Sequence, residues 1–411
     1  MARLLVIMGS GETAPTMVKP HRAIFEQLGA GAAVILDTPY GFQTNADDIS
    51  TKAVGYFAAS VGRDVQIASW RTRDIGGIAR ERALGALRDA QWIFAGPGSP
   101  TYVLRQWHDT PVPGLLVDRL RDQGVVVFAS AAALTLGSHT IPVYEIYKAG
   151  VEPAWVPGLD LVHQVTGLPA VIIPHYDNAE GGHHDTRFCY LGETRLSMME
   201  AELPSESFVI GVDEHTAVVL DLDARTATVV GNGTMTIRQR GRSIVHPSGD
   251  VVPFDALTSG VTDAPLAAPT VETVAAPVDE RIGASLRGDT DRLAGVFDAA
   301  LAADDIDGCV ETILELEQVL LDWSADTLTS DEGDHARATL RQMVVKLGDL
   351  ARSEQGSNKA IAPLMDVLLA IRRRARDDKD FATSDTIRDQ LGALDIEIRD
   401  TPTGAVWQRR S

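Results

Sequence analysis

The sequence predicts an α/β fold for its first 260 residues, with a mostly parallel sheet flanked by helices. It predicts an all-α helical bundle with a small C-terminal hairpin for the remainder. Up to about residue 260, short apolar runs alternate with helical stretches, which is typical of a parallel sheet covered on both faces. Beyond residue 278 the strand signal almost disappears and amphipathic helical patterns take over.

Buried strands are expected where short apolar runs end at Gly, Pro or Asp. The runs that meet this criterion are Leu4–Met8, Ala33–Asp37, Val65–Ser69, Trp92–Ala95, Val125–Ala129 and Ala170–Pro174. Helices are expected between them, as at Ala79–Ala90 and Tyr102–Trp107. Further strands with hairpin character follow at Thr216–Asp221, Thr226–Val230 and Thr234–Arg238, with a turn signal at Gly231–Gly233.

Composition divides the chain into four segments. The α/β domain is expected at 1–260 and an extended linker at 261–278, where prolines and alanines replace aromatic residues. A helical bundle is expected at 279–352, followed by a separate module at 353–411.

The chain has 411 residues and a net charge of −20, which argues against a protein that coats nucleic acid or anionic membrane with its whole surface. Residues 353–411 carry ten acidic and ten basic side chains, so the excess of acidic over basic side chains lies entirely before residue 353. Two cysteines, Cys189 and Cys309, indicate no disulfide framework, and no apolar run is long enough to cross a membrane. We therefore expect a cytoplasmic protein with no membrane partner.

Ser130 is the candidate nucleophile. It follows the apolar strand Val125–Ala129 and precedes the small residues Ala131–Ala133, which can begin a helix. A nucleophile elbow has this form, because a tight strand-to-helix turn holds the hydroxyl above the sheet and needs small neighbours. Phe128 stands where the usual elbow has glycine. The alternative interpretation is a serine that simply caps a helix.

A serine nucleophile needs a base and an orienting acid. His175 follows the predicted strand Ala170–Pro174, and open α/β sheets place ligands at the carboxyl ends of their strands. The acid is predicted to be Glu214, with Asp177 and Asp213 as alternatives. A histidine that only caps the end of its strand is the structural alternative.

Two further segments carry groups that could bind a substrate. The loop 95–102 can offer backbone amides, with Thr101 beside them, and the polar segment 174–187 includes Asp177, Asn178 and Arg187. Arg187 is a candidate clamp for a carboxylate. Metal ligation by Glu180, His183, His184 and Asp185 is an alternative, but no zinc-type spacing supports it, so we expect neither a metal nor another cofactor.

Together, Ser130, the loop Gly-Pro-Gly-Ser-Pro-Thr-Tyr-Val-Leu, His175 and the strand Gly-Val-Asp-Glu-His-Thr-Ala-Val-Val-Leu-Asp resemble the cyanophycinase and peptidase E family. This is the serine-hydrolase branch of the class I glutamine amidotransferase-like fold, and the resemblance covers roughly residues 1–245. It implies that Ser130 is the nucleophile, His175 the base and Glu214 the acid. It also implies that Gly98 and Ala131 supply the amides of an oxyanion hole.

The sequence departs from this family at two places. The elbow reads Phe-Ala-Ser-Ala-Ala instead of Gly-Thr-Ser-Ala-Gly, and Ile173-Pro174 precede the histidine where cyanophycinases have Asp-Gln. Arg187 is the next arginine, whereas the family has several close by. The resemblance therefore does not imply the family's aspartyl-peptide specificity, and a serine in the elbow does not imply glutamine amidotransferase activity.

The C-terminal segment combines a basic helix, an amphipathic helix and a short hairpin. Its pattern RxxARxxKDF…SDxIRDxL…IxIxDTPxGxxW closely resembles the C-terminal end of cysteinyl-tRNA synthetases. The resemblance implies binding of a tRNA anticodon arm through Arg372, Arg376, Lys379, Arg388, Asp400 and Trp407. A solvated Arg/Asp face with a packed tryptophan is the alternative. The chain has no HIGH-like or KMSKS-like motif and is not expected to be a synthetase.

These features predict a serine hydrolase of peptidase or amidase type that acts through an acyl-enzyme. Its substrate would be a small peptide or an acyl group carried on tRNA. The alternative hypothesis is a non-catalytic tRNA-binding or regulatory protein with a degenerate hydrolase domain. A third hypothesis makes the helical module a platform for a partner or for a homo-oligomer.

Overall fold

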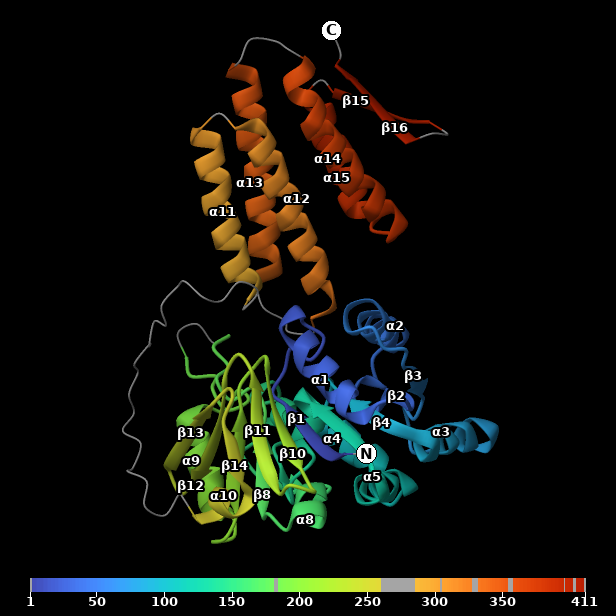
Figure 1. Cartoon of the computed structure of the whole chain (residues 1–411), viewed down its shortest axis with the longest axis vertical. Helices are drawn as coiled ribbons and strands as arrows, with labels where there is room; N and C mark the ends of the chain where they lie inside the picture. The colour runs from blue at the N-terminus through green and yellow to red at the C-terminus, as the bar shows by residue number, and fades with distance from the viewer. Residues whose placement is uncertain are drawn as a thin grey trace. The chain divides into compact units, whose positions relative to one another are not determined.

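The structure is a computed structural model. It describes residues 2–180, 184–259, 285–303, 305–326, 332–353, 358–394, 396–401 and 404–409. The chain divides into two compact units, which are described separately (Figure 1). The first unit comprises Met1–Val278 with Ala325–Ser330, and the second comprises Asp279–Ser324 with Asp331–Ser411. The predicted linker 261–278 lies outside the described residues.

An eight-stranded sheet is the framework of the first unit. Its strands, in spatial order, are β14 (Val251–Pro253), β11 (Thr226–Gly231), β10 (Thr216–Asp221), β1 (Arg3–Met8), β5 (Gly124–Ala129), β4 (Ala90–Ala95), β2 (Ala32–Leu36) and β3 (Gln66–Ala68). The five strands from β1 to β3 in this order run parallel, and β10, β11 and β14 continue the sheet antiparallel. The prediction of a mostly parallel sheet is confirmed.

A second sheet in the first unit contains β13 (Arg242–Pro247), β12 (Thr234–Gln239), β9 (Phe208–Val212) and β8 (Ala170–Ile173). The predicted strand at Ala170 therefore belongs here and pairs in parallel with β9, not with the main sheet. The turn Gly231–Gly233 does not close a hairpin, because β11 and β12 lie in different sheets. Gly231 has φ of +114°, and a Cβ there would lie 2.4 Å from the His215 carbonyl oxygen, so this crossing requires glycine.

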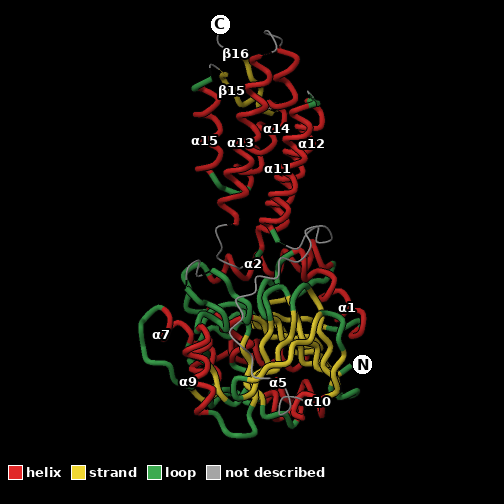
Figure 2. The backbone as a smooth tube through the Cα atoms, turned by 90° about the vertical axis from the view of Figure 1, so that its left-hand side faces the viewer, coloured by secondary structure: helices red, strands yellow, loops and turns green. Residues whose placement is uncertain are grey.

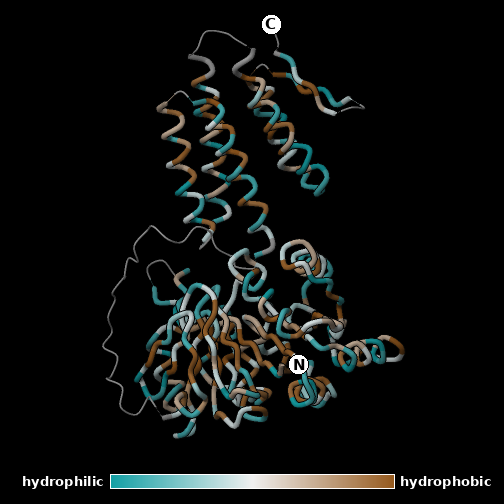
Figure 3. The backbone as a smooth tube through the Cα atoms, viewed as in Figure 1, coloured by the Kyte–Doolittle hydropathy of each residue, from teal (hydrophilic) through white to brown (hydrophobic). Residues whose placement is uncertain are grey.

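Helices cover both faces of the main sheet, which forms a central layer in Figure 2. The helices of the first unit are α1 (Val18–Leu28), α2 (Ala46–Tyr56), α3 (Gly77–Asp89), α4 (Pro100–Trp107), α5 (Pro111–Asp122), α6 (Ser130–Leu134), α7 (Val143–Tyr147), α8 (Leu161–Thr166), α9 (Gly192–Glu202) and α10 (Phe254–Ser259). Of these, α7 and α9 pack against β8 and β9 of the second sheet. Leu4 and Val6 of β1 face one core with α1, whereas Leu5 and Ile7 face the other with α3 and α5. Burial on both faces explains the continuous apolar runs, which Figure 3 shows along the strands.

The second unit is helical with a small hairpin, as predicted. It contains α11 (Leu286–Ala302), α12 (Ile306–Asp322), α13 (Glu332–Ser353), α14 (Asn358–Asp377) and α15 (Phe381–Gly392), followed by the antiparallel pair β15 (Ile396–Thr401) and β16 (Gly404–Arg409). One apolar core joins the helices to the hairpin through residues such as Phe297, Leu316 and Ile396. Among the described residues, no helix is both long and apolar enough to span a membrane.

Candidate active site

Ser130 lies at the turn between β5 and α6 in a left-handed conformation, with φ of +50°. Its Oγ lies 2.8 Å from His175 Nε2. The helix-cap interpretation of Ser130 is wrong, because Ala129 occupies the N-cap position of α6 and no side chain caps the helix there. A non-glycine residue in this conformation costs about 1–2 kcal/mol. Such strain is concentrated at functional sites, where the surrounding structure enforces it.

Phe128 does not obstruct the serine. Its side chain is fully buried in the core and its ring lies 5.6 Å from that of Trp107, whereas Ser130 remains partly exposed. The feature that motivated a degenerate site therefore packs away from the hydroxyl. The small residues after the serine serve close packing, since the Ala132 amide donates to the Gly96 carbonyl at 3.3 Å. This contact holds the start of α6 against the loop before α4.

His175 reaches the serine from the second sheet, two residues after the end of β8. It too is left-handed, with φ of +49°. Its carbonyl accepts hydrogen bonds from the amides of Cys189, at 3.1 Å, and Asn178, at 3.3 Å. The backbone thus fixes the position of the imidazole, which is largely buried.

Glu214 lies behind the imidazole, with Oε1 2.8 Å from His175 Nδ1. Asn178 donates to the same oxygen at 3.1 Å. Burial raises the pKa of Glu214, but the hydrogen bonds from His175 and Asn178 outweigh it and keep the pKa below its usual value. An ionised Glu214 accepts a hydrogen bond from Nδ1–H, so the proton stays on Nδ1 and Nε2 is left to accept a hydrogen bond from the Ser130 hydroxyl.

The two alternative acids, Asp177 and Asp213, accept hydrogen bonds from backbone amides and not from the His175 imidazole. Asp177 Oδ1 accepts a hydrogen bond from the backbone N–H of Glu214 at 2.8 Å. Asp177 therefore positions the Glu214 carboxylate indirectly, through the backbone. Asp213 accepts from the amide and hydroxyl of Thr234, at 2.8 and 2.7 Å, which ties it to β12. Of the three candidates, Glu214 is the one that contacts His175.

A left-handed turn that the residue types did not signal supports His175. Phe188, Cys189 and Tyr190 have φ of +60°, +55° and +66° in succession. The Phe188 amide donates to the Tyr176 carbonyl at 3.0 Å, next to the bond from Cys189 to His175. Non-glycine residues rarely adopt this conformation consecutively. The turn therefore adds strained backbone directly beneath the imidazole.

Two backbone amides, one just before α4 and one at the start of α6, have no acceptor among the described residues. Within the described part of the chain, the N–H groups of Gly98 and Ala131 donate to no protein acceptor. Gly98 has φ of +143°, and a Cβ there would lie 1.9 Å from the Pro39 carbonyl oxygen, so this position must be glycine. Free amides next to a nucleophile are the groups that can stabilise an oxyanion.

The side chains predicted to bind substrate make contacts within the protein. The Thr101 hydroxyl donates to Glu145 Oε1 at 2.7 Å, and Asn178 is buried against Glu214. Arg187 forms two 2.8 Å hydrogen bonds to Asp185, so its guanidinium fork is already occupied by a carboxylate. Of the proposed metal ligands, His183 lies outside the described residues, and among those described no group of three acids, histidines or cysteines could hold a metal ion.

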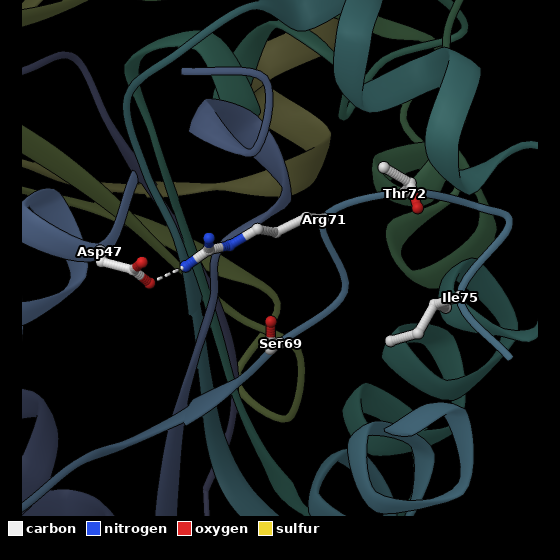
Figure 4. A pocket seen from close by; sticks show the side chains of 5 residues that line it. All are labelled: Asp47, Ser69, Arg71, Thr72 and Ile75. Carbon is white, nitrogen blue, oxygen red and sulfur yellow. Dashed lines mark hydrogen bonds and ion pairs between the residues drawn. The ribbon is translucent and has the colours of Figure 1, made fainter. Parts of the chain in front are cut away.

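A cavity of about 400 Å³ lies further along the carboxyl edge of the main sheet, next to β3 (Figure 4). Arg71 crosses it and pairs with Asp37 at 2.8 Å and with Asp47 at 2.5 Å. Asp37 is fully buried and also accepts from Ser69. Because two carboxylates already satisfy Arg71, we interpret the cluster as a structural link between the loops after β2 and β3.

In the second unit, the basic residues predicted to bind tRNA are largely paired. Arg372 is 5% exposed and binds both oxygens of Asp400, at 2.7 and 3.1 Å, and Arg376 binds the same carboxylate at 2.7 Å. The hydrogen bond with Arg372 lowers the pKa of Asp400 to about 2. These pairs attach the hairpin to α14.

The remaining tRNA-binding candidates differ in what their side chains contact. Arg388 pairs with Asp385 and Asp389, and Trp407 packs against the core of the second unit. Lys379 is exposed, with no carboxylate of the described residues within ion-pairing distance. The same holds for Arg373 on α14. Among the described cations of residues 359–407, these two are therefore available to an anionic partner.

Comparison with family models gives one match, at residues 359–407, to the family described as the cysteinyl-tRNA ligase anticodon binding domain. Curated relatives include the cysteine–tRNA ligases of Salinibacter ruber, 34% identical over 152 residues, and of Porphyromonas gingivalis, 42% identical over 85 residues. These matches cover 32% and 20% of this chain, and 30% and 17% of the ligases. The chain thus matches less than a third of the length of these relatives.

Among solved structures, a peptidase from an acI-B1 Actinobacterium is similar, with a TM-score of 0.50 and 19% sequence identity. The superposition covers 62% of this chain and 98% of the peptidase chain. At this level of identity the likeness establishes a shared fold.

Proposed function

We propose that the first unit is a serine hydrolase of peptidase or amidase type that acts through an acyl-enzyme. The observation that carries this proposal is the hydrogen-bonded series Ser130–His175–Glu214, with both links at 2.8 Å. A nucleophile, a base and an acid in this order are the components of a serine hydrolase triad. The shared fold with a peptidase supports the same proposal.

The geometry supports a two-step reaction. Ser130 Oγ attacks a carbonyl carbon while His175 Nε2 takes the hydroxyl proton, and Glu214 stabilises the imidazolium. The amides of Gly98 and Ala131 would bind the developing oxyanion. His175 then protonates the leaving group, which departs and leaves the acyl group on Ser130. A water molecule, deprotonated by the same imidazole, hydrolyses this ester.

A fluorophosphonate probe tests the nucleophile directly. The full-length protein should be labelled on Ser130, and Ser130→Ala should not be labelled, because the probe reacts only with an activated hydroxyl. Ser205→Ala is the matched control, since Ser205 is exposed and its hydroxyl donates to Glu206, not to a residue of the triad. Equal labelling of the wild type and Ser130→Ala would contradict the proposal.

We further propose that the second unit binds tRNA. Binding would bring the hydrolase to a substrate that is attached to the tRNA or released near the tRNA. The match of residues 359–407 to an anticodon-binding family supports this partner. The acidic total of the chain does not oppose it, because the excess charge lies before residue 353. Within the described part of residues 359–407, Arg373 and Lys379 are exposed cations without a carboxylate partner, so they are the residues that we expect to contact phosphates.

Binding of total tRNA, followed by fluorescence anisotropy over a salt series, tests this second proposal. The double variant Arg373→Gln/Lys379→Gln should bind more weakly and lower the salt slope by about 2, because each cation that contacts a phosphate contributes about 1. Lys52→Gln/Arg82→Gln removes the same charge from exposed positions of the first unit and should bind like the wild type. No binding at low salt, where electrostatic attraction is strongest, would refute an RNA role.

A further inference from the structure

We propose that Asn178 is a positioning residue of the triad, which holds the Glu214 carboxylate against the His175 imidazole by donating a hydrogen bond to it. The inference rests on the proposed hydrolase function and adds a residue to its machinery. From the sequence, Asn178 was a candidate for binding substrate. In the structure it is 1% exposed, so it acts on the reaction through its protein neighbours.

Asn178 contacts both the acid and the base of the triad. Its Nδ2 donates to Glu214 Oε1 at 3.1 Å, and the same oxygen accepts from His175 Nδ1 at 2.8 Å. The backbone N–H of Asn178 donates to the His175 carbonyl at 3.3 Å. One residue thus ties the Glu214 carboxylate to the backbone that carries the imidazole, although Glu214 and His175 are 39 positions apart in the chain.

The two ends of the Asn178 amide have different partners, which fixes its orientation. Oδ1 accepts from the backbone N–H of Glu180 at 3.3 Å, so Nδ2 is the end that faces Glu214. The reversed amide would place its carbonyl oxygen against the carboxylate and its NH₂ group against an N–H. The position therefore requires a donor at one end and an acceptor at the other. Aspartate has the same shape, but when ionised it has acceptors only.

Glu214 gains from a second donor because its side chain is long and partly accessible. The side chain is 20% exposed, so one hydrogen bond to His175 would leave the carboxylate several rotamers to sample. A donor on the same oxygen selects the orientation in which Oε1 faces Nδ1. Burial raises the pKa of Glu214, but the hydrogen bonds from His175 and Asn178 keep this pKa below its usual value. Asn178 thus favours both the position and the charge of the acid.

The residues around Asn178 support the same arrangement. The preceding residue, Asp177, accepts from the backbone N–H of Glu214 at 2.8 Å. Two consecutive side chains after His175 and Tyr176 therefore hold the backbone and the carboxylate of Glu214. The Thr186 hydroxyl donates to the Asn178 carbonyl at 3.3 Å, which attaches the segment to the chain beyond it.

Rates of fluorophosphonate labelling of Ser130 in the full chain test the inference. Asn178→Ala should label about 10- to 100-fold more slowly at pH 7, because a hydrogen bond to a charged group is lost. Asn178→Asp should label at least as slowly, since it keeps the shape but replaces the donor with a second carboxylate. Asn45→Ala and Asn45→Asp are the matched controls, because Asn45 is exposed and its side chain does not cap its helix.

The pH dependence of labelling separates positioning from a purely structural role. Without the donor, Glu214 takes up a proton at higher pH, so Asn178→Ala should lose labelling at a higher pH than the wild type as the pH falls. All the described titratable groups that interact with Glu214 remain in this variant. They are His175, Asp177, Cys189, Tyr190, Asp213 and His215.

A double variant tests whether Asn178 acts through Glu214. Adding Asn178→Ala to Glu214→Gln should slow labelling by less than about 3-fold further, because the carboxylate that Asn178 holds is already gone. A full additive loss, or wild-type labelling by Asn178→Asp, would overturn the inference and leave the hydrolase proposal standing. Absence of labelling in the wild type would refute both. The aspartate variant also guards against misfolding of the alanine variant, because it leaves no cavity.

Discussion

Replacing His175 with alanine should slow acyl transfer by about 10⁶-fold, and Glu214→Gln by about 10⁴-fold. Among the described residues, His175 is the hydrogen-bond partner of the Ser130 hydroxyl, so without the imidazole the hydroxyl remains a weak nucleophile. The glutamine variant keeps the shape of Glu214 but loses the charge that stabilises the imidazolium. The smaller effect follows because Glu214 acts through His175.

Rates of fluorophosphonate labelling, with the amount of folded protein matched by circular dichroism, measure both effects. His163→Ala is the control, because His163 is an exposed histidine on α8 and should label like the wild type. A loss below about 10-fold for His175→Ala would mean that Ser130 is not activated by this histidine. A Glu214→Gln variant without any loss, together with a slow Asp213→Asn variant, would transfer the role of the acid to Asp213.

Replacing Arg238 with methionine should destabilise the first unit by about 3–5 kcal/mol, because one partner of a buried ion pair is removed. The Arg238 side chain is 4% exposed. It donates to Glu200 at 3.1 Å and to both oxygens of Glu193, at 2.9 and 2.6 Å, and so joins β12 to α9. Its guanidinium also lies 5.5 Å from the ring of Phe188, in the left-handed turn that supports His175.

Urea unfolding of the full chain, followed by tryptophan fluorescence, gives the free energy of unfolding for this variant. Arg240→Met is the matched control, since Arg240 is exposed, and it should unfold like the wild type. Adding Glu200→Met to Arg238→Met should recover part of the loss, because most of the cost comes from a carboxylate left buried without its cation. A loss below about 1 kcal/mol for Arg238→Met would show that the pair does not stabilise the sheet.

The strands of the first unit were predictable because burial leaves a local signature. Val125–Ala129 and Ala33–Asp37 are buried on both faces of the sheet, so they appear as continuous apolar runs between turn residues. The position of Ser130 after such a run was sufficient to suggest an elbow. Its φ of +50° accompanies the close approach of α6 to Gly96, which the alanines after the serine allow.

The assignment of β8 to a second sheet was not predictable, because an apolar run does not specify its pairing partner. The same limit applies to the left-handed turn at Phe188–Tyr190, whose residue types are ordinary. From the sequence, Arg187 was a candidate to bind a substrate carboxylate. In the structure its guanidinium binds the carboxylate of Asp185 instead.

The second unit shows the same division. The sequence marked a cluster of arginines and an aspartate in a family-like pattern, but it could not distinguish cations that stabilise the fold from cations that are free. Packing of the hairpin against α14 places Asp400 between Arg372 and Arg376. Both arginines form ion pairs with this carboxylate. Arg373 differs from its neighbours only in the helix face it occupies.

The sequence by itself determined the two-part architecture, most strands of the main sheet and the serine and histidine of the candidate site. These depend on local periodicity and on residue types that follow strand ends. Only the tertiary structure decided that Glu214, not Asp177 or Asp213, contacts His175, and that Arg372 and Arg376 share Asp400. Such contacts join positions far apart in the chain, and their energies depend on burial and on every neighbouring charge.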